Sequence, residues 1–171
     1  MGGCRRWYKG HHVQQLVGKS PTAQGKFAVQ DLPFVIEDIQ KSGVTLSPRI
    51  GCMAHSFLEP QPIKGARIYW LAHILHNLPD AVCQIVPANL REAMTPGYSK
   101  LIIANTVIAD ENVPLRQSGL DITMLLLHNG SQRSEAEWRQ LLEEAGFTVN
   151  NIWHPPGDGD GIIVAEVPQL Q

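Results

Sequence analysis

The sequence predicts an α/β fold in which a mostly parallel sheet ends in an antiparallel hairpin. Short segments rich in branched and aromatic residues, such as 67–71 and 99–107, alternate with segments whose apolar residues recur at helical spacing. This alternation is typical of a parallel sheet with helices on both faces. Near the end of the sequence, 147–154 and 162–167 are joined by PPGDGDG. That connection is too short for a crossover helix, so these two strands should pair antiparallel.

Length and composition favour one domain over residues 1–171, with 43% hydrophobic and 18% charged residues. A net charge of -2 gives no electrostatic reason to expect nucleic acid or an anionic membrane as a partner. No apolar stretch is long enough to span a membrane, and the polar first residues lack the apolar segment of a signal peptide. Cys4, Cys52 and Cys83 are widely spaced, which favours reduced thiols in a cytoplasmic protein, and no metal-ligand spacing is present.

The first third of the chain should hold two helices and two strands. In order, they are a helix within 10–20, a strand at 26–30, a helix at 33–41 and a strand between loops within 44–57. Asp31 follows the first of these strands directly. An acidic residue in this place can accept hydrogen bonds from both ribose hydroxyls of a nucleotide. The alternative for Asp31 is a solvated helix cap ahead of Pro33.

The strand at 67–71 is followed at once by the polar residues His73, His76 and Asn77. Open α/β sheets bind their ligands at the carboxyl ends of central strands, which makes His76 a candidate functional residue. The spacing alone equally allows His76 to pack in or cap a loop.

The second half of the chain continues the alternation of helices and strands. A helix is expected from Asp80 to about Met94, with a kink or break at Pro87, and it is followed by a buried strand at 99–107. A polar loop at 109–118, a helical segment at 120–127 and a helix that begins at Ser134 and stops at Gly146 come next. Ser134 and Glu137 have the spacing of a capping box, in which each side chain accepts a backbone N–H of the other residue.

Together these segments resemble the S-adenosylmethionine-dependent methyltransferases, and more narrowly the plant and fungal O-methyltransferases that act on phenolic natural products. The motifs that carry the resemblance cover nearly the whole chain in family order: GHHVQQLV, FAVQDLP, FLEPQPIKGARIYWLAHILHNLPD, MTPGYSKLIIANTV, GLDITMLLLHNGSQRSEAEWRQLLEEAGF and GIIVAEV. Two of them, QPIKGARIYWL and MTPGYSKL, are most similar to fungal members. The resemblance implies a Rossmann-like class I methyltransferase sheet, S-adenosylmethionine as cofactor, and a small phenolic acceptor from fungal secondary metabolism.

The resemblance also implies roles for residues near the acceptor. His76 matches the histidine that acts as the general base in the family. A base is needed because a free phenol, with a pKa of about 10, is mostly protonated at neutral pH. Met124 matches a methionine placed against the aromatic acceptor, although packing inside a helix explains it equally well. The two carboxylates that orient the family histidine fall at Asn105 and Gln132, which are neutral amides.

For the cofactor, the resemblance places Asp31 at the ribose, Ser56 where the family has an acidic residue near the adenine, and Gly10 in a remnant of the glycine-rich loop, together with Gly2 and Gly3. A neutral Ser56 forgoes a charge-assisted hydrogen bond, which is worth about 1.5–3 kcal/mol. The family's preceding strand is expected to be missing or degraded, and its amino-terminal dimerisation domain to be absent.

These departures lead us to expect weak cofactor binding and poor or absent methyl transfer from the isolated chain. Three functions therefore remain open. The chain is an O-methyltransferase, or a non-catalytic relative that is vestigial or docks on a full-length partner, or a repurposed pocket that guides a cyclisation or rearrangement without methyl transfer. A homodimer or an association with a full-length relative is the expected assembly.

Overall fold

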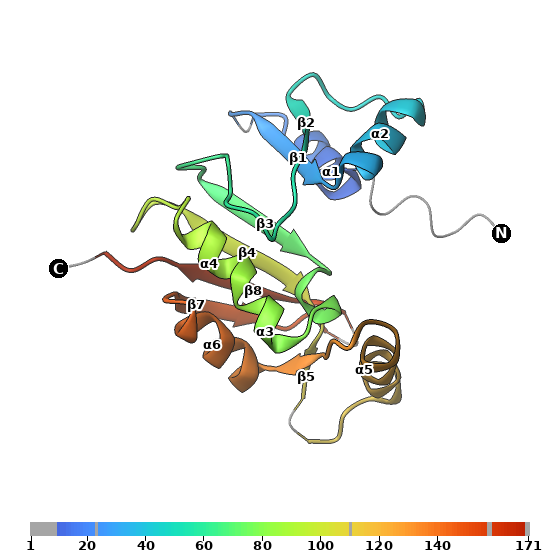
Figure 1. Cartoon of the computed structure of the whole chain (residues 1–171), viewed down its shortest axis with the longest axis vertical. Coiled ribbons are helices and arrows are strands. Elements are labelled where there is room, and N and C mark those ends of the chain that lie inside the picture. The colour runs from blue at the N-terminus through green and yellow to red at the C-terminus, as the bar shows by residue number, and fades with distance from the viewer. Residues whose placement is uncertain (1–9, 23, 110, 157–158, 170–171) are drawn as a thin grey trace. The chain divides into compact units, whose positions relative to one another are not determined.

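The computed structural model describes residues 10–22, 24–109, 111–156 and 159–169 of the chain (Figure 1). The chain divides into two compact units, Met1–Glu59 (unit 1) and Pro60–Gln171 (unit 2). Gly2, Gly3 and Cys4, which entered the sequence predictions, lie outside the described residues. Among the helices that are described, none combines the length and apolar content that crossing a membrane requires.

Over its described residues unit 1 contains the two helices and two strands that were predicted, and its strands form a separate two-stranded parallel sheet. Its elements are α1 (His11–Lys19), β1 (Phe27–Asp31), α2 (Pro33–Lys41) and β2 (Ile50–Ala54). Pro33 occupies the first turn of α2, where its fixed φ suits the helix and its missing N–H costs nothing. The register places Asp31 opposite Ala54, so the carboxyl ends of both strands lie at the same edge of this sheet.

Unit 2 is built on a four-stranded sheet in the order β3-β4-β8-β7. The strands are β3 (Ile68–Ala72), β4 (Lys100–Asn105), β7 (Thr148–Trp153) and β8 (Gly161–Glu166). β3 and β4 are parallel, whereas β8 is antiparallel to both β4 and β7. The predicted hairpin is therefore confirmed, and its second strand returns between β7 and β4.

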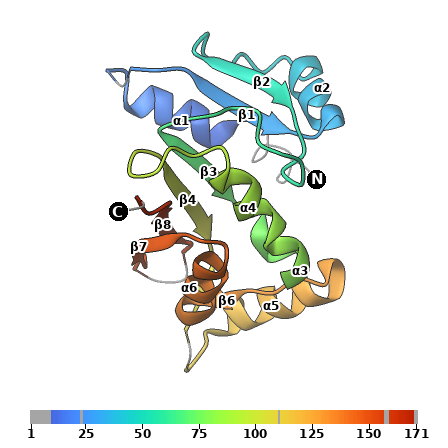
Figure 2. The same cartoon turned by 60° about the vertical axis from the view of Figure 1, so that its left-hand side comes forward.

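Several short helices and a second pair of strands complete unit 2. They are the 3-10 helix η1 (Leu75–Asn77), α3 (Asp80–Cys83), α4 (Ile85–Arg91), β5 (Val107–Ile108), α5 (Leu115–His128), β6 (Arg133–Ser134) and α6 (Glu135–Glu144). In both views α3, α4 and α6 lie along one side of the sheet (Figure 1 and Figure 2). Buried side chains such as Val86, Trp138 and Leu142 from these helices, with Leu101 and Ile163 from the sheet, form the core of the unit.

Three predicted elements differ from the observed ones. The strand predicted at 99–107 is divided into β4 and β5, which belong to different sheets. The helix after Asp80 breaks at Gln84, before Pro87, and ends at Arg91 rather than near Met94. A proline ring clashes with the carbonyl group four residues earlier, which here belongs to Cys83, so the break falls at that point. The helix predicted at 120–127 begins already at Leu115, directly after Pro114.

Candidate active site

His76 lies on η1, immediately beyond the carboxyl end of β3. His73 makes the turn: its backbone takes a left-handed conformation with φ of 54°, and its N–H donates to Ala104 O on β4 at 3.1 Å. Non-glycine residues adopt this conformation only where the surroundings hold them in it. The His76 side chain that follows is buried, with 8% of the residue exposed.

Burial lowers the pKa of His76, and the neighbouring His73 lowers it further. Removing an imidazolium from water costs more than removing a neutral imidazole, so the buried ring is neutral at physiological pH. A neutral imidazole has a free lone pair with which it can accept a proton. His76 therefore has the protonation state that a general base requires.

The Gln132 amide contacts the His76 ring, with its Nε2 3.4 Å from Nδ1. If Nε2 of Gln132 donates to Nδ1 of His76, the His76 ring carries its proton on the ring Nε2. Turning the amide over would place Gln132 Oε1, which has no hydrogen-bond partner among the described residues, against a protonated Nδ1. That arrangement leaves the ring Nε2 free to accept a proton, so this amide can set the tautomer without supplying a charge.

Asn105 ends β4 and is fully buried. Neither polar atom of its side chain has a hydrogen-bond partner within the described part of the chain. Buried amides are normally paired, so this side chain offers an unused donor and an unused acceptor. The structure thus brings His76 and Gln132 into contact, and it leaves Asn105 at the end of the neighbouring strand.

Met124 is half-buried on α5, and α5 contacts η1. Most other apolar side chains of α5 are exposed, including Leu115 (89%), Leu126 (78%) and Leu127 (70%). The apolar side chains of α5 therefore lie largely outside the core of unit 2.

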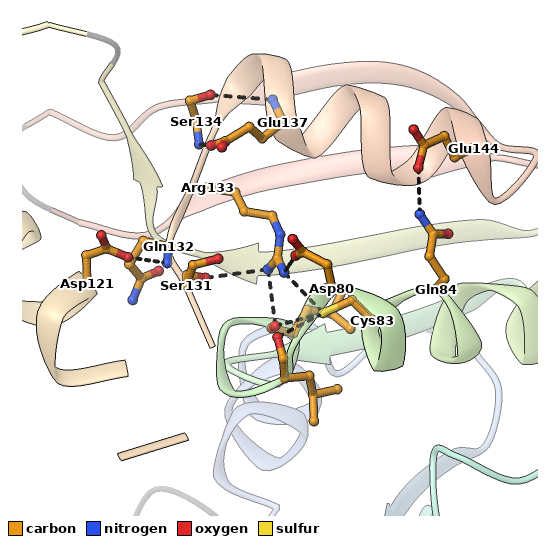
Figure 3. A network of polar contacts seen from close by, with 12 residues as sticks. Asp80, Cys83, Gln84, Asp121, Ser131, Gln132, Arg133, Ser134, Glu137 and Glu144 are labelled. Atoms are coloured by element: carbon orange, nitrogen blue, oxygen red, sulfur yellow. Dashed lines mark hydrogen bonds and ion pairs between the residues drawn. The ribbon is translucent and has the colours of Figure 1, made fainter. Parts of the chain in front are cut away.

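Three residues near His76 were missed by the sequence predictions. Asp160 Oδ2 lies 3.0 Å from His73 Nε2, and the His73 ring centroid is 5.6 Å from that of His76. Gly130 packs so closely that a Cβ there would lie 2.1 Å from His76 O. Arg133 is the third, and Figure 3 shows it at the centre of a polar network with Asp80 and Cys83. Of the three, only Gly130 carried a local signal, since it closes the predicted helix in the tripeptide His-Asn-Gly.

Unit 1 carries the residues predicted for the cofactor. Asp31 is the last residue of β1, and its Oδ1 accepts the N–H of Leu32 at 2.8 Å. Ser56 follows β2 at the same edge of the sheet, since His55 N donates to Asp31 O at 2.9 Å. Gly10 precedes α1 with φ of 72°, and a Cβ there would lie 3.1 Å from a methyl group of Val29 on β1. All three predicted positions therefore lie close to the strands of this unit.

No group of three or more His, Cys, Asp or Glu side chains that could hold a metal ion occurs within the described ranges. Each unit by itself offers different chemistry: unit 2 has a buried imidazole with a lowered pKa beside an amide group, and unit 1 has a carboxylate at a strand end.

Comparison with known proteins identifies relatives over most of the chain. The family model for the O-methyltransferase domain matches residues 8–148. The O-methyltransferase asqD of Emericella nidulans is 35% identical over 159 residues, which cover 92% of this chain and 40% of that protein. The demethylsterigmatocystin 6-O-methyltransferase stcP of the same fungus is 31% identical over 156 residues, covering 91% of this chain and 73% of that protein. The chain thus spans 40% of the length of asqD.

Solved structures agree with these relatives. A structure described as a pericyclic reaction enzyme superposes with a TM-score of 0.87 at 28% identity and covers 93% of this chain and 40% of its own. The structure of LepI in complex with SAM gives the same TM-score and identity, again with 93% and 40% coverage. The same fold therefore occurs in a structure described as a pericyclic reaction enzyme and in the complex of LepI with SAM.

Proposed function

The chain belongs to the O-methyltransferase family, and we propose that it transfers the methyl group of S-adenosylmethionine to a hydroxyl group of a phenolic or polyketide-type fungal metabolite. The observation that carries this proposal is the buried His76, whose pKa is lowered by burial and whose ring is contacted by Gln132. The names of the fungal relatives, one of which methylates demethylsterigmatocystin, support the acceptor class.

In this proposal His76 acts on the acceptor hydroxyl. When bound, S-adenosylmethionine supplies an electrophilic methyl group on a sulfonium sulfur, and the sulfur leaves as a neutral thioether. The hydroxyl oxygen forms the new bond to the methyl carbon while its proton passes to Nε2 of His76. His76 accepts this proton most readily when Gln132 Oε1 accepts the Nδ1–H. A neutral amide stabilises the resulting imidazolium less than a carboxylate would.

The residues of unit 1 fit the proposed cofactor. Asp31 uses Oδ1 for the N–H of Leu32, and its second carboxylate oxygen has acceptor capacity for ribose hydroxyl groups. The left-handed Gly10, packed against β1, keeps the backbone free of a side chain where a loop would approach a ligand. Ser56 would lie towards the adenine, and its hydroxyl offers a weaker, uncharged contact. We propose that Asp31 contributes most of the cofactor affinity.

The remaining parts of the proposal concern the chain as a whole. Residues 1–171 would act as a single carboxyl-terminal methyltransferase domain in the cytoplasm. Met124 would contact the acceptor from α5. The chain would work as a homodimer or together with a full-length relative.

A second candidate function is a metabolite-binding pocket that guides a cyclisation or rearrangement without methyl transfer. The neutral Asn105 and Gln132, together with the fold shared with a pericyclic reaction enzyme, favour it. In this case His76 and the unpaired amide of Asn105 would bind polar groups of the metabolite. Product formation that does not depend on added S-adenosylmethionine would distinguish this function from the first.

The test of the first function is methyl transfer from labelled S-adenosylmethionine to a panel of phenolic acceptors. His76→Gln should lower kcat by about 10²–10⁴-fold, because general base catalysis contributes about that much. His154→Gln is the matched control, since His154 is exposed and pairs with Glu135. Unchanged activity in a folded His76→Gln variant would refute the assignment of the base.

A further inference from the structure

We propose that Arg133 is a positioning residue that holds the peptide unit between Leu75 and His76 and thereby fixes where the His76 imidazole projects. This inference rests on the proposed function, in which His76 is the base, and adds a residue that acts through it. Arg133 belongs to the short strand β6 and touches neither the imidazole nor either reactant in the proposed reaction.

The guanidinium group of Arg133 is buried, with 3% of the residue exposed, and both of its terminal nitrogens donate hydrogen bonds. Its Nη1 donates to Leu75 O at 3.2 Å. Its Nη2 donates to Asp80 Oδ1 at 2.6 Å and to Cys83 Sγ at 3.3 Å (Figure 3). The planar guanidinium group therefore connects the Leu75 carbonyl group with the first and the last residue of α3.

Cys83 adds a second route from the guanidinium to the same carbonyl. Its Sγ accepts from Arg133 and donates to Leu75 O at 3.1 Å. Burial raises the pKa of Cys83, so the thiol keeps the proton that it donates. Leu78 N also donates to Leu75 O, at 3.3 Å. The Leu75 carbonyl thus receives three donors, and it shares a rigid plane with the N–H of His76.

Arg133 is itself held in place by contacts of its own side chain and of the preceding residue. Its guanidinium lies 5.4 Å from the ring centroid of the buried Trp138 on α6. The preceding residue, Gln132, contacts the His76 ring, and its backbone N–H donates to Asp121 Oδ1 at 2.7 Å. Two consecutive residues therefore hold His76. Gln132 contacts the His76 ring, and Arg133 binds the carbonyl group of the peptide unit that precedes His76.

The test is Arg133→Lys in the full 171-residue chain, with the His76 pKa measured by NMR. The charge is kept but the planar fork is lost, so a change at His76 reports on position. The ionisable groups that shift the pKa of His76 are His73, Asp160 and His128, and this variant leaves all three in place. His76→Gln assigns the resonance. Arg139→Lys is the matched control, because Arg139 lies on α6 and pairs with Glu135.

We expect the pKa of His76 to rise towards that of a free histidine in folded Arg133→Lys, since the ring loses burial. We also expect kcat to fall by about 10- to 100-fold with the KM for S-adenosylmethionine unchanged, because misplacement of a reacting group by about 1 Å has such an effect. An unchanged pKa and kcat in the folded variant would overturn the proposal. The NMR result stands even if the wild-type chain transfers no methyl group, an outcome that would refute the proposed function alone.

If Arg133→Lys does not fold, Asp80→Asn provides the second measurement. The Asp80 side chain is 83% exposed, so its replacement is tolerated, yet it removes the carboxylate that aligns Nη2. We expect a smaller shift of the His76 pKa in the same direction. An unfolded Arg133→Lys together with an unchanged His76 in Asp80→Asn would overturn the proposal, because Arg133 would then serve folding only.

Discussion

The two units of the chain differ in how densely their candidate functional residues are surrounded by packed side chains. Unit 2 surrounds His76 with a four-stranded sheet, packed helices and a buried polar network. Unit 1 has a two-stranded sheet, its buried apolar side chains among the described residues are Ile36, Ile39 and Ile50, and α1 buries none. His76 is thus held by a dense core, whereas the residues proposed for the cofactor depend on few buried apolar contacts of their own unit.

Amide hydrogen exchange should show the largest difference between the units. Local opening free energies follow buried apolar contact, so the amides of β4 and β8 should exchange at least about 10³-fold more slowly than those of β1 and β2. Exchange measured by mass spectrometry on the full chain gives this ratio. Equal protection in the two sheets would mean that the units open together, and the comparison would fail.

Alanine in place of glycine should have opposite effects in the two units. At Gly130 a Cβ would lie 2.1 Å from His76 O, so Gly130→Ala should reduce the free energy of unfolding by about 2–4 kcal/mol. At Gly18, inside α1, nothing lies within 4 Å, so Gly18→Ala should increase it by about 0.5–1 kcal/mol. Urea unfolding of both variants measures the two changes.

Gly119→Ala serves as the control for position within unit 2. Gly119 lies inside α5, and a Cβ at this position would have nothing within 4 Å, so its replacement should stabilise in the same way as that of Gly18. Destabilisation by Gly119→Ala would show that replacing a glycine destabilises unit 2 even without a close contact, so the loss at Gly130 could not be assigned to the contact with His76.

The loss of a helix cap should change the free energy of unfolding by a smaller amount. Ser134 and Glu137 form both hydrogen bonds of a capping box at α6, as predicted, whereas α1 and α2 have no side-chain cap. Ser134→Ala should therefore cost about 1 kcal/mol in urea unfolding. A change below about 0.3 kcal/mol would indicate that the packing of α6 fixes its start without the cap.

Acidification should produce the smallest effect, and it should arise in unit 2. Because burial lowers the pKa of His76, the unfolded chain binds a proton at this residue more readily than the folded chain. The contribution to stability is complete above the ordinary histidine pKa and is lost as the pH falls through the folded value. Between about pH 7.5 and about pH 5.5 the wild type should lose more stability than His76→Gln. Equal losses would contradict the assigned shift.

Most of the fold was predictable because its signals are local. Helical spacing, Pro33, the capping box and the short connection in PPGDGDG each act within a few residues, and the helices and strands that they mark appear. The early start of α5 was not predictable from the same signals. Its first residue, Leu115, is 89% exposed and follows Pro114, so neither an apolar face nor a polar cap marks the beginning.

The site was predictable only in part, for a different reason. His76 stands directly after a strand, and sheet geometry makes that position informative from the sequence alone. The contacts of Arg133 and Asp160 join residues more than fifty positions apart, from Arg133 to Leu75 and from Asp160 to His73. No spacing rule reaches across such distances, so these residues emerged only from the three-dimensional arrangement.

The position of β8 between β4 and β7 has a consequence for the order of folding. β7 and β8 are neighbours in sequence, so their pairing is fast, whereas β4 must wait for partners that lie far along the chain in both directions. Asn105, at the end of β4, pairs with Gly161, at the start of β8. We therefore expect the hairpin to form early and the strand end that carries Asn105 to be completed late, as one of the final folding events of a newly made chain.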